Sequence, residues 1–65
     1  MNKFYINWYD GVHSGFVDYN GDFVTDNLEE RADFFNSEEE VKKEIEKIKE
    51  KNPHCCPLEV GVLEC

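Results

Sequence analysis

Only one segment of this chain, residues 37–51, repeats its apolar residues at helical spacing, and this limits the possible folds most. The apolar residues lie four and three positions apart on an otherwise charged segment: Val41, Ile45 and Ile48. Ser37 followed by Glu40 fits a capping box, in which each side chain accepts a hydrogen bond from a free backbone N–H. The sequence therefore predicts a single amphipathic helix, and one helix can cover only one face of a sheet.

The rest of the chain has the period-two pattern of β-strands. Residues 3–9 place Phe4, Ile6 and Trp8 on one face and polar or aromatic residues on the other. Turn signals at Asp10-Gly11 and Asn20-Gly21 separate this strand from two more, and the second signal is typical of a two-residue hairpin. The predicted strands cover residues 3–9, 14–19, 22–25 and 58–63.

Residues 26–36 show no clean period, so we expect a connection with one helical turn, held to the core by its apolar residues. The predicted fold is α+β: one domain of residues 1–65, with an antiparallel sheet in β-β-β-α-β order and the helix on one face. The other face, carrying Tyr5, Tyr9 and Leu63, should then meet water, a partner or a target.

Net charge restricts the function. The 15 acidic residues outnumber the 7 basic ones, which gives a formal charge of −8. Binding to the phosphates of nucleic acid requires clustered Lys and Arg, and an anionic membrane would repel this acidic chain. Neither nucleic acid nor a membrane is therefore an expected partner. No stretch has the length of a membrane span and the first residues lack a secretion signal, so we expect a cytoplasmic protein.

The chain shows no pattern typical of an enzyme. His13 is adjacent to Ser14, but neighbouring side chains on an extended segment point apart, and no nucleotide-binding motif is present. We therefore expect a protein that is not an enzyme and needs no cofactor.

The residue types suggest two possible metal sites. His54, Cys55, Cys56 and Cys65 carry zinc-ligand chemistry, but the spacing lacks a Cys-x-x-Cys knuckle, so reduced thiols are the favoured interpretation. A Cys56–Cys65 disulfide remains an alternative in an oxidised sample. Residues 18–22 resemble a calcium loop only superficially, because the EF-hand register is missing. No metal site is predicted.

Acidity is concentrated between residues 18 and 33, where six acidic residues accompany Arg31 alone, a net −5. A field of one sign steers association with a partner of opposite charge, and aromatic residues within it can serve as anchors. We therefore expect a basic protein partner. The candidate partner-binding residues are Asp18, Tyr19, Asp22, Phe23, Asp26, Glu29, Glu30 and Asp33.

The segment Phe35-Asn36-Ser37-Glu38-Glu39-Glu40-Val41, continuing to Ile45 and Ile48 after an aromatic meander, resembles the small acidic reading frames of phages and mobile elements. Such proteins include anti-defence inhibitors of the anti-CRISPR kind, some of which mimic DNA by presenting ordered acidic groups to a basic groove. This resemblance implies inhibition of a nucleic-acid-handling or host-defence protein by binding to its surface.

A second function stays open, namely a self-associating module with a structural or small-molecule-binding role. Two copies would pair through sheet faces or strand edges, and Tyr5, Tyr9 and Leu63 would be interfacial.

Overall fold

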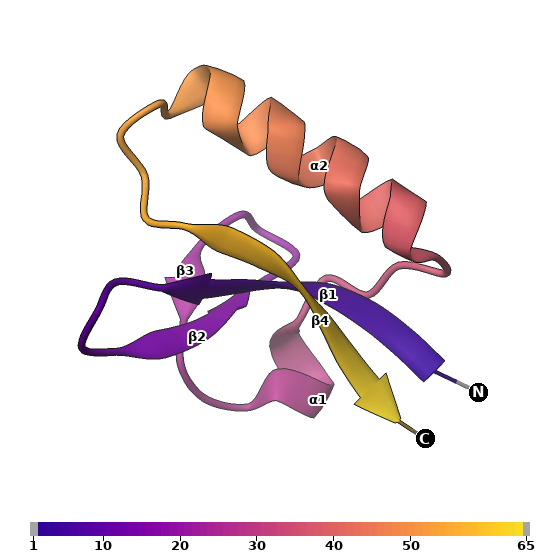
Figure 1. Cartoon of the computed structure of the whole chain (residues 1–65). Coiled ribbons are helices and arrows are strands. Elements are labelled where there is room, and N and C mark those ends of the chain that lie inside the picture. The colour runs from indigo at the N-terminus through magenta and orange to yellow at the C-terminus, as the bar shows by residue number, and fades with distance from the viewer. Residues whose placement is uncertain (1, 65) are drawn as a thin grey trace.

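The computed structural model describes residues 2–64 and confirms the predicted α+β class (Figure 1). Four antiparallel strands form one sheet in the order β3-β2-β1-β4. Helix α2 lies on one side of this sheet and the short helix α1 on the other (Figure 1). In chain order the elements are β1 (Asn2–Tyr9), β2 (Ser14–Val17), β3 (Phe23–Val24), α1 (Leu28–Arg31), α2 (Glu38–Lys51) and β4 (Leu58–Glu64).

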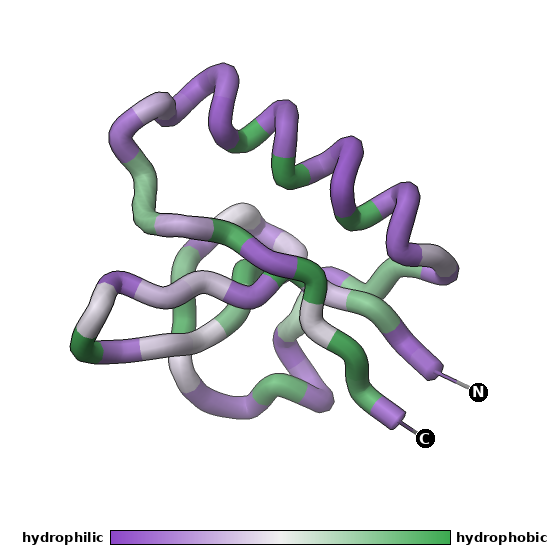
Figure 2. Tube along the Cα trace, viewed as in Figure 1, coloured by the Kyte–Doolittle hydropathy of each residue, from purple (hydrophilic) through white to green (hydrophobic). Residues whose placement is uncertain are grey.

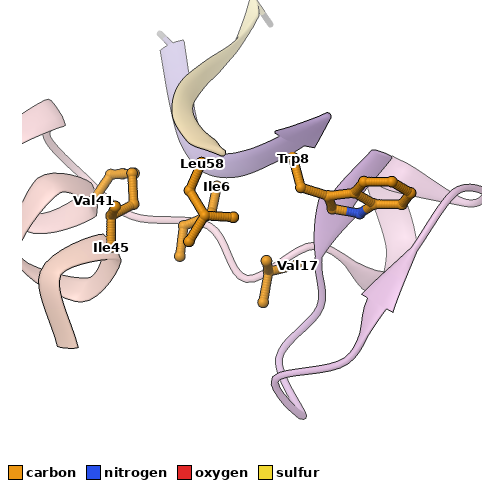
Figure 3. Close-up of a cluster of buried hydrophobic side chains, with 6 residues drawn as sticks. All are labelled: Ile6, Trp8, Val17, Val41, Ile45 and Leu58. Carbon is orange, nitrogen blue, oxygen red and sulfur yellow. The ribbon is translucent and has the colours of Figure 1, made fainter. Parts of the chain in front are cut away.

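The core lies between α2 and the sheet face that the alternation of β1 predicted. Its fully packed side chains come from both layers (Figure 3): Ile6, Trp8, Val17, Val41, Ile45 and Leu58. The green stripe on the side of α2 that faces the sheet in Figure 2 is the predicted apolar stripe. The helix begins as expected, because the Ser37 hydroxyl accepts a hydrogen bond from the Glu40 N–H at 3.4 Å.

Strand β1 has two different neighbours on the side away from β4. Its C-terminal half pairs with β2, from Asn7↔Phe16 to Tyr9↔Ser14. Its N-terminal half is bridged by Phe35, which exchanges backbone hydrogen bonds with Phe4 at 3.2 and 2.7 Å. The connection after α1 therefore passes between β1 and the end of β2.

The second face of the sheet is partly covered, which corrects the expectation that it meets water or a partner throughout. The Phe34 ring packs edge-on against Tyr5, with centroids 6.3 Å apart, and the Lys3 ammonium lies 5.1 Å from the Phe34 centroid. Phe16 on this face is buried, whereas Tyr9 remains exposed and Leu63 is half-buried.

The β2–β3 turn differs from the predicted two-residue hairpin. The Gly21 N–H donates to the Asp18 carbonyl and the Asp18 N–H donates to the Asp22 carbonyl, both at 2.9 Å. Gly21 has a φ of 85°, and no positive φ occurs at Asn20. This is a three-residue loop with a left-handed glycine. The predicted strands are shortened accordingly, and β3 has only 2 residues.

Candidate protein-binding surface

The structure divides the eight predicted binding residues into three groups. Asp18 is buried, Asp33 is half-buried beneath α2, and the other six are exposed around β3 and α1. These six residues form the acidic edge: Tyr19, Asp22, Phe23, Asp26, Glu29 and Glu30.

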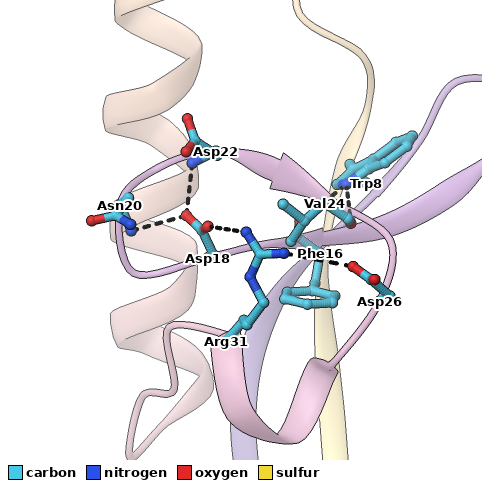
Figure 4. A network of polar contacts seen from close by, with 8 residues as sticks. All are labelled: Trp8, Phe16, Asp18, Asn20, Asp22, Val24, Asp26 and Arg31. Carbon is cyan, nitrogen blue, oxygen red and sulfur yellow. Dashed lines mark hydrogen bonds and ion pairs between the residues drawn. The ribbon is translucent and has the colours of Figure 1, made fainter.

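Asp18 is an internal anchor, which corrects its assignment to the binding surface. The residue is 2% exposed. One carboxylate oxygen, Oδ1, accepts hydrogen bonds from the backbone N–H groups of Asn20 and Asp22, both at 2.9 Å (Figure 4). The other oxygen, Oδ2, lies 3.3 Å from Nη2 of Arg31. With its oxygens used inside the fold, Asp18 cannot be offered to a partner.

These contacts favour the ionised form of Asp18. The Asp22 N–H is the largest cause that holds the pKa of the Asp18 carboxyl below its usual range, followed in the same direction by the Asn20 N–H and the Arg31 guanidinium. Burial opposes them.

Arg31 links α1 to the hairpin, and sequence reasoning did not find this role. Its guanidinium contacts Asp18 on one side and Oδ1 of Asp26 on the other, at 3.6 Å (Figure 4). The backbone reinforces the link, because the Tyr19 N–H donates to the Arg31 carbonyl at 3.2 Å. The one available signal was that Arg31 is the only base among residues 18–33.

The Trp8 indole holds β3 against β2. Its Nε1 lies within hydrogen-bond distance of the carbonyls of Phe16 (3.1 Å) and Val24 (3.2 Å) (Figure 4). The indole also stacks on Phe23, with centroids 6.0 Å apart. A Cβ at Gly15 would lie 2.8 Å from the indole and 2.1 Å from the Val24 carbonyl, so only glycine admits this packing.

The aromatic members of the acidic edge keep accessible surface despite this packing. Phe23 is 40% exposed and Tyr19 66% exposed. Aromatic side chains amid polar groups are typical anchors of protein interfaces. Of the acidic members, Asp26 shares Arg31 with Asp18, while no ion pair involves Asp22, Glu29 or Glu30 among residues 2–64.

Asp33 faces a different environment from the other predicted carboxylates. It lines a groove of about 390 Å³ between the hairpin and α2, together with Tyr19, Phe23 and Glu44. Burial, and secondarily the negative charge of Glu44, raises the pKa of the Asp33 carboxyl. Asp33 therefore borders the acidic edge from the α2 side rather than belonging to it.

His13 lies in the exposed loop between β1 and β2, with its Nδ1 3.9 Å from Oδ2 of Asp10. Oδ1 of Asp10 accepts from the N–H groups of Val12 and His13, so this loop is organised by its own turn. No group of three or more His, Cys, Asp or Glu side chains suited to a metal ion occurs among residues 2–64.

The candidate zinc ligands are only partly within the described residues. Cys55 and Cys56 are free thiols that pack against the core, and Cys65 lies outside the described residues. The zinc set and the Cys56–Cys65 disulfide both include Cys65, so both lie outside the described residues.

No family model, no curated protein and no solved structure matches this chain. In addition, no helix of residues 2–64 is both long and apolar enough to cross a bilayer. Function is therefore inferred from the surface of the chain itself.

Proposed function

We propose that this protein is a non-enzymatic, acidic binding protein that inhibits a larger basic protein by occupying its surface with the acidic edge. The target class we favour is a nucleic-acid-handling or host-defence protein, because such proteins carry the basic surfaces that an acidic edge complements. The single observation that carries this proposal is the set of exposed carboxylates, at Asp22, Glu29 and Glu30, that no base of the described chain neutralises.

The fold supports such a role by positioning the backbone that carries these carboxylates before binding. Asp18 and Arg31 hold the hairpin to α1, so Asp22 and Glu30 extend from two segments joined through one partly buried ion pair. A surface that is ordered in advance loses little conformational entropy on binding. Tyr19 and Phe23 add apolar contact area beside the charges.

The test is a capture experiment with three forms of the full chain. The first is the wild type, and the second carries Asp22→Lys, Asp26→Lys and Glu30→Lys. The third is a control with the same charge change on exposed positions of α2 away from β4, namely Glu38→Lys, Glu39→Lys and Glu50→Lys. Circular dichroism and thermal unfolding verify that all three fold.

We expect the wild type and the control to retain the same basic protein from host lysate, with retention decreasing as salt rises. If each exposed pair contributes about 0.5 kcal/mol, the first triple variant should bind about 10-fold more weakly or worse. Duplex DNA should compete with the wild type if the target surface is a nucleic-acid groove. Equal retention by both triple variants, or retention that salt does not affect, would refute the proposal.

A further inference from the structure

The two edges of the sheet differ sharply in length and protection. Strand β3 forms one edge with 2 residues, whereas β4 forms the other with 7. Proteins commonly protect edge strands with proline, charged side chains (lysine above all), bulges or short length. The sequence of strand β4, LEVGVLE, lacks Pro and Lys, and its register with β1 runs without interruption from Trp8↔Leu58 to Asn2↔Glu64. Its charged side chains are Glu59 and Glu64, near its two ends.

The register shows which backbone groups of β4 point away from the sheet. Phe4 exchanges hydrogen bonds with Phe35 on the β2 side of β1, and the Tyr9 N–H donates to the Pro57 carbonyl on the β4 side. Alternate residues of a strand direct their backbone groups to opposite sides. Odd-numbered residues of β1 therefore bond to β4, and their register partners are Glu59, Gly61 and Leu63. The outward groups of β4 belong to Leu58, Val60, Val62 and Glu64.

We propose that β4 pairs antiparallel with β4 of a second copy of this chain, about a two-fold axis through Gly61. This register places Val60 opposite Val62 of the second copy and brings outward backbone groups together at each such pair. Val62 is 45% exposed, so the pairing covers apolar surface. Neither Glu59 nor Glu64 faces its own counterpart, because Glu59 lies opposite Leu63 and Glu64 opposite Leu58.

Local charge permits this contact in spite of the −8 on each copy. A groove of about 420 Å³ runs between α2 and β4, with Ile45, Leu58 and Val60 as its apolar lining. Its charged lining is balanced, with Lys42 and Lys49 against Glu46 and Glu59. Strand β3, which carries Asp22 and Phe23 of the acidic edge beside and within it, lies at the opposite edge of the sheet, so these groups are remote from β4.

The paired sheet would present two acidic edges. Its strand order would run from β3 of one copy to β3 of the other, and with strands about 4.8 Å apart the two β3 strands would lie about 34 Å from each other. A basic partner with two sites at that separation would gain avidity. The pairing itself does not depend on the proposed function.

The test measures mass and amide exchange on the purified full chain. We expect the mean mass from sedimentation equilibrium to rise from 7.7 kDa toward twice that value as concentration increases from about 10 µM to about 1 mM. Added salt should preserve or strengthen the dimer by screening the net charge, whereas it weakens capture through the acidic edge. The two surfaces can therefore fail independently.

Two variants and one control identify the strand. Val62→Lys places a charge in the pairing face, and Val62→Pro removes an outward N–H that carries no bond to β1. Both should remain folded monomers. Val12→Lys makes the same chemical change in the exposed β1–β2 loop and should leave the dimer intact.

Amide exchange reports the register directly. In the dimer, the N–H groups of Val60 and Val62 should become protected as concentration rises, while those of Glu59 and Gly61 are protected throughout. A mean mass that stays at the monomer value up to about 1 mM in sedimentation equilibrium would overturn the proposal. A dimer that persists in both Val62 variants, or one without concentration-dependent protection at Val60 and Val62, would overturn it as well.

Discussion

Replacing Ile6 by alanine tests the packing that holds the sheet and α2 together. Ile6 is 1% exposed and belongs to the core cluster with Val17, Val41 and Ile45. The change removes three methylene equivalents, worth about 2.4 kcal/mol at 0.8 kcal/mol each, and leaves a cavity that adds to the loss. We expect the free energy of unfolding to fall by about 3–4 kcal/mol.

That loss is large for a chain of this size, whose total stability should be about 3–10 kcal/mol on a per-residue basis. Urea unfolding followed by circular dichroism measures it, and the melting temperature should fall by about 15–25 °C. Ile6→Val should cost about 0.5–1.5 kcal/mol and keeps the test informative if the alanine variant does not fold. Val12→Ala in the exposed loop should change stability by less than about 0.5 kcal/mol. A loss below about 1 kcal/mol for Ile6→Ala would refute the assignment of this face to the core.

Two further predictions concern local structure. Ser37→Ala should lower stability by about 1 kcal/mol, because the Glu40 N–H loses its acceptor at the start of α2; an unchanged urea midpoint would contradict this. The lowered pKa of Asp18 stabilises the fold at pH values above the unfolded-state pKa, and this contribution is lost as the pH falls through the folded-state pKa. Asp18→Asn should therefore be less stable than the wild type at pH 7, with a difference that shrinks in acid. A difference that stays constant between pH 7 and about pH 3 would show that the ionised carboxylate is not responsible.

The parts of the fold that sequence predicted correctly are those determined by local periodicity. The alternation of β1 and the spacing of Val41 and Ile45 each identify a buried face without knowledge of what packs on it. The start of α2 was predictable for the same reason, since its cap involves only residues from Asn36 to Glu40.

The expected helical turn between residues 26 and 36 is present as α1, but the strand-like path of residues 32–35 could not be predicted, because its alternation serves two different layers. Phe35 pairs with Phe4 and joins the core on the α2 side, whereas the adjacent Phe34 packs on Tyr5 on the other side. Ala32 is bridged to Asp18 in the same extended segment. The period-two alternation of this short extended segment is hard to recognise between charged residues. Only its contacts with residues distant in sequence define its structure.

The candidate surface was predicted in outline, but composition could not separate anchoring carboxylates from exposed ones. Asp18 and Asp22 both flank the hairpin turn, yet only Asp18 turns inward to accept the N–H groups that the loop leaves free. That distinction depends on the three-residue loop and on the position of Arg31, which is 13 residues away in sequence. Counting charges along the sequence shows which segment is acidic, but it cannot show which carboxylate is bonded inside the fold and which remains exposed.

The location of this acidity also bears on how the chain avoids indiscriminate self-pairing. At the β3 edge, the short strand and the exposed Asp22 and Asp26 would bring like charges together in any two-fold contact. At the β4 edge, the two glutamates are placed so that antiparallel pairing about Gly61 keeps each opposite a leucine. The same charge distribution therefore favours a basic partner at the β3 edge and a second copy of the chain at the β4 edge. Added salt should weaken binding of the basic partner, whereas it should preserve or strengthen the β4–β4 dimer.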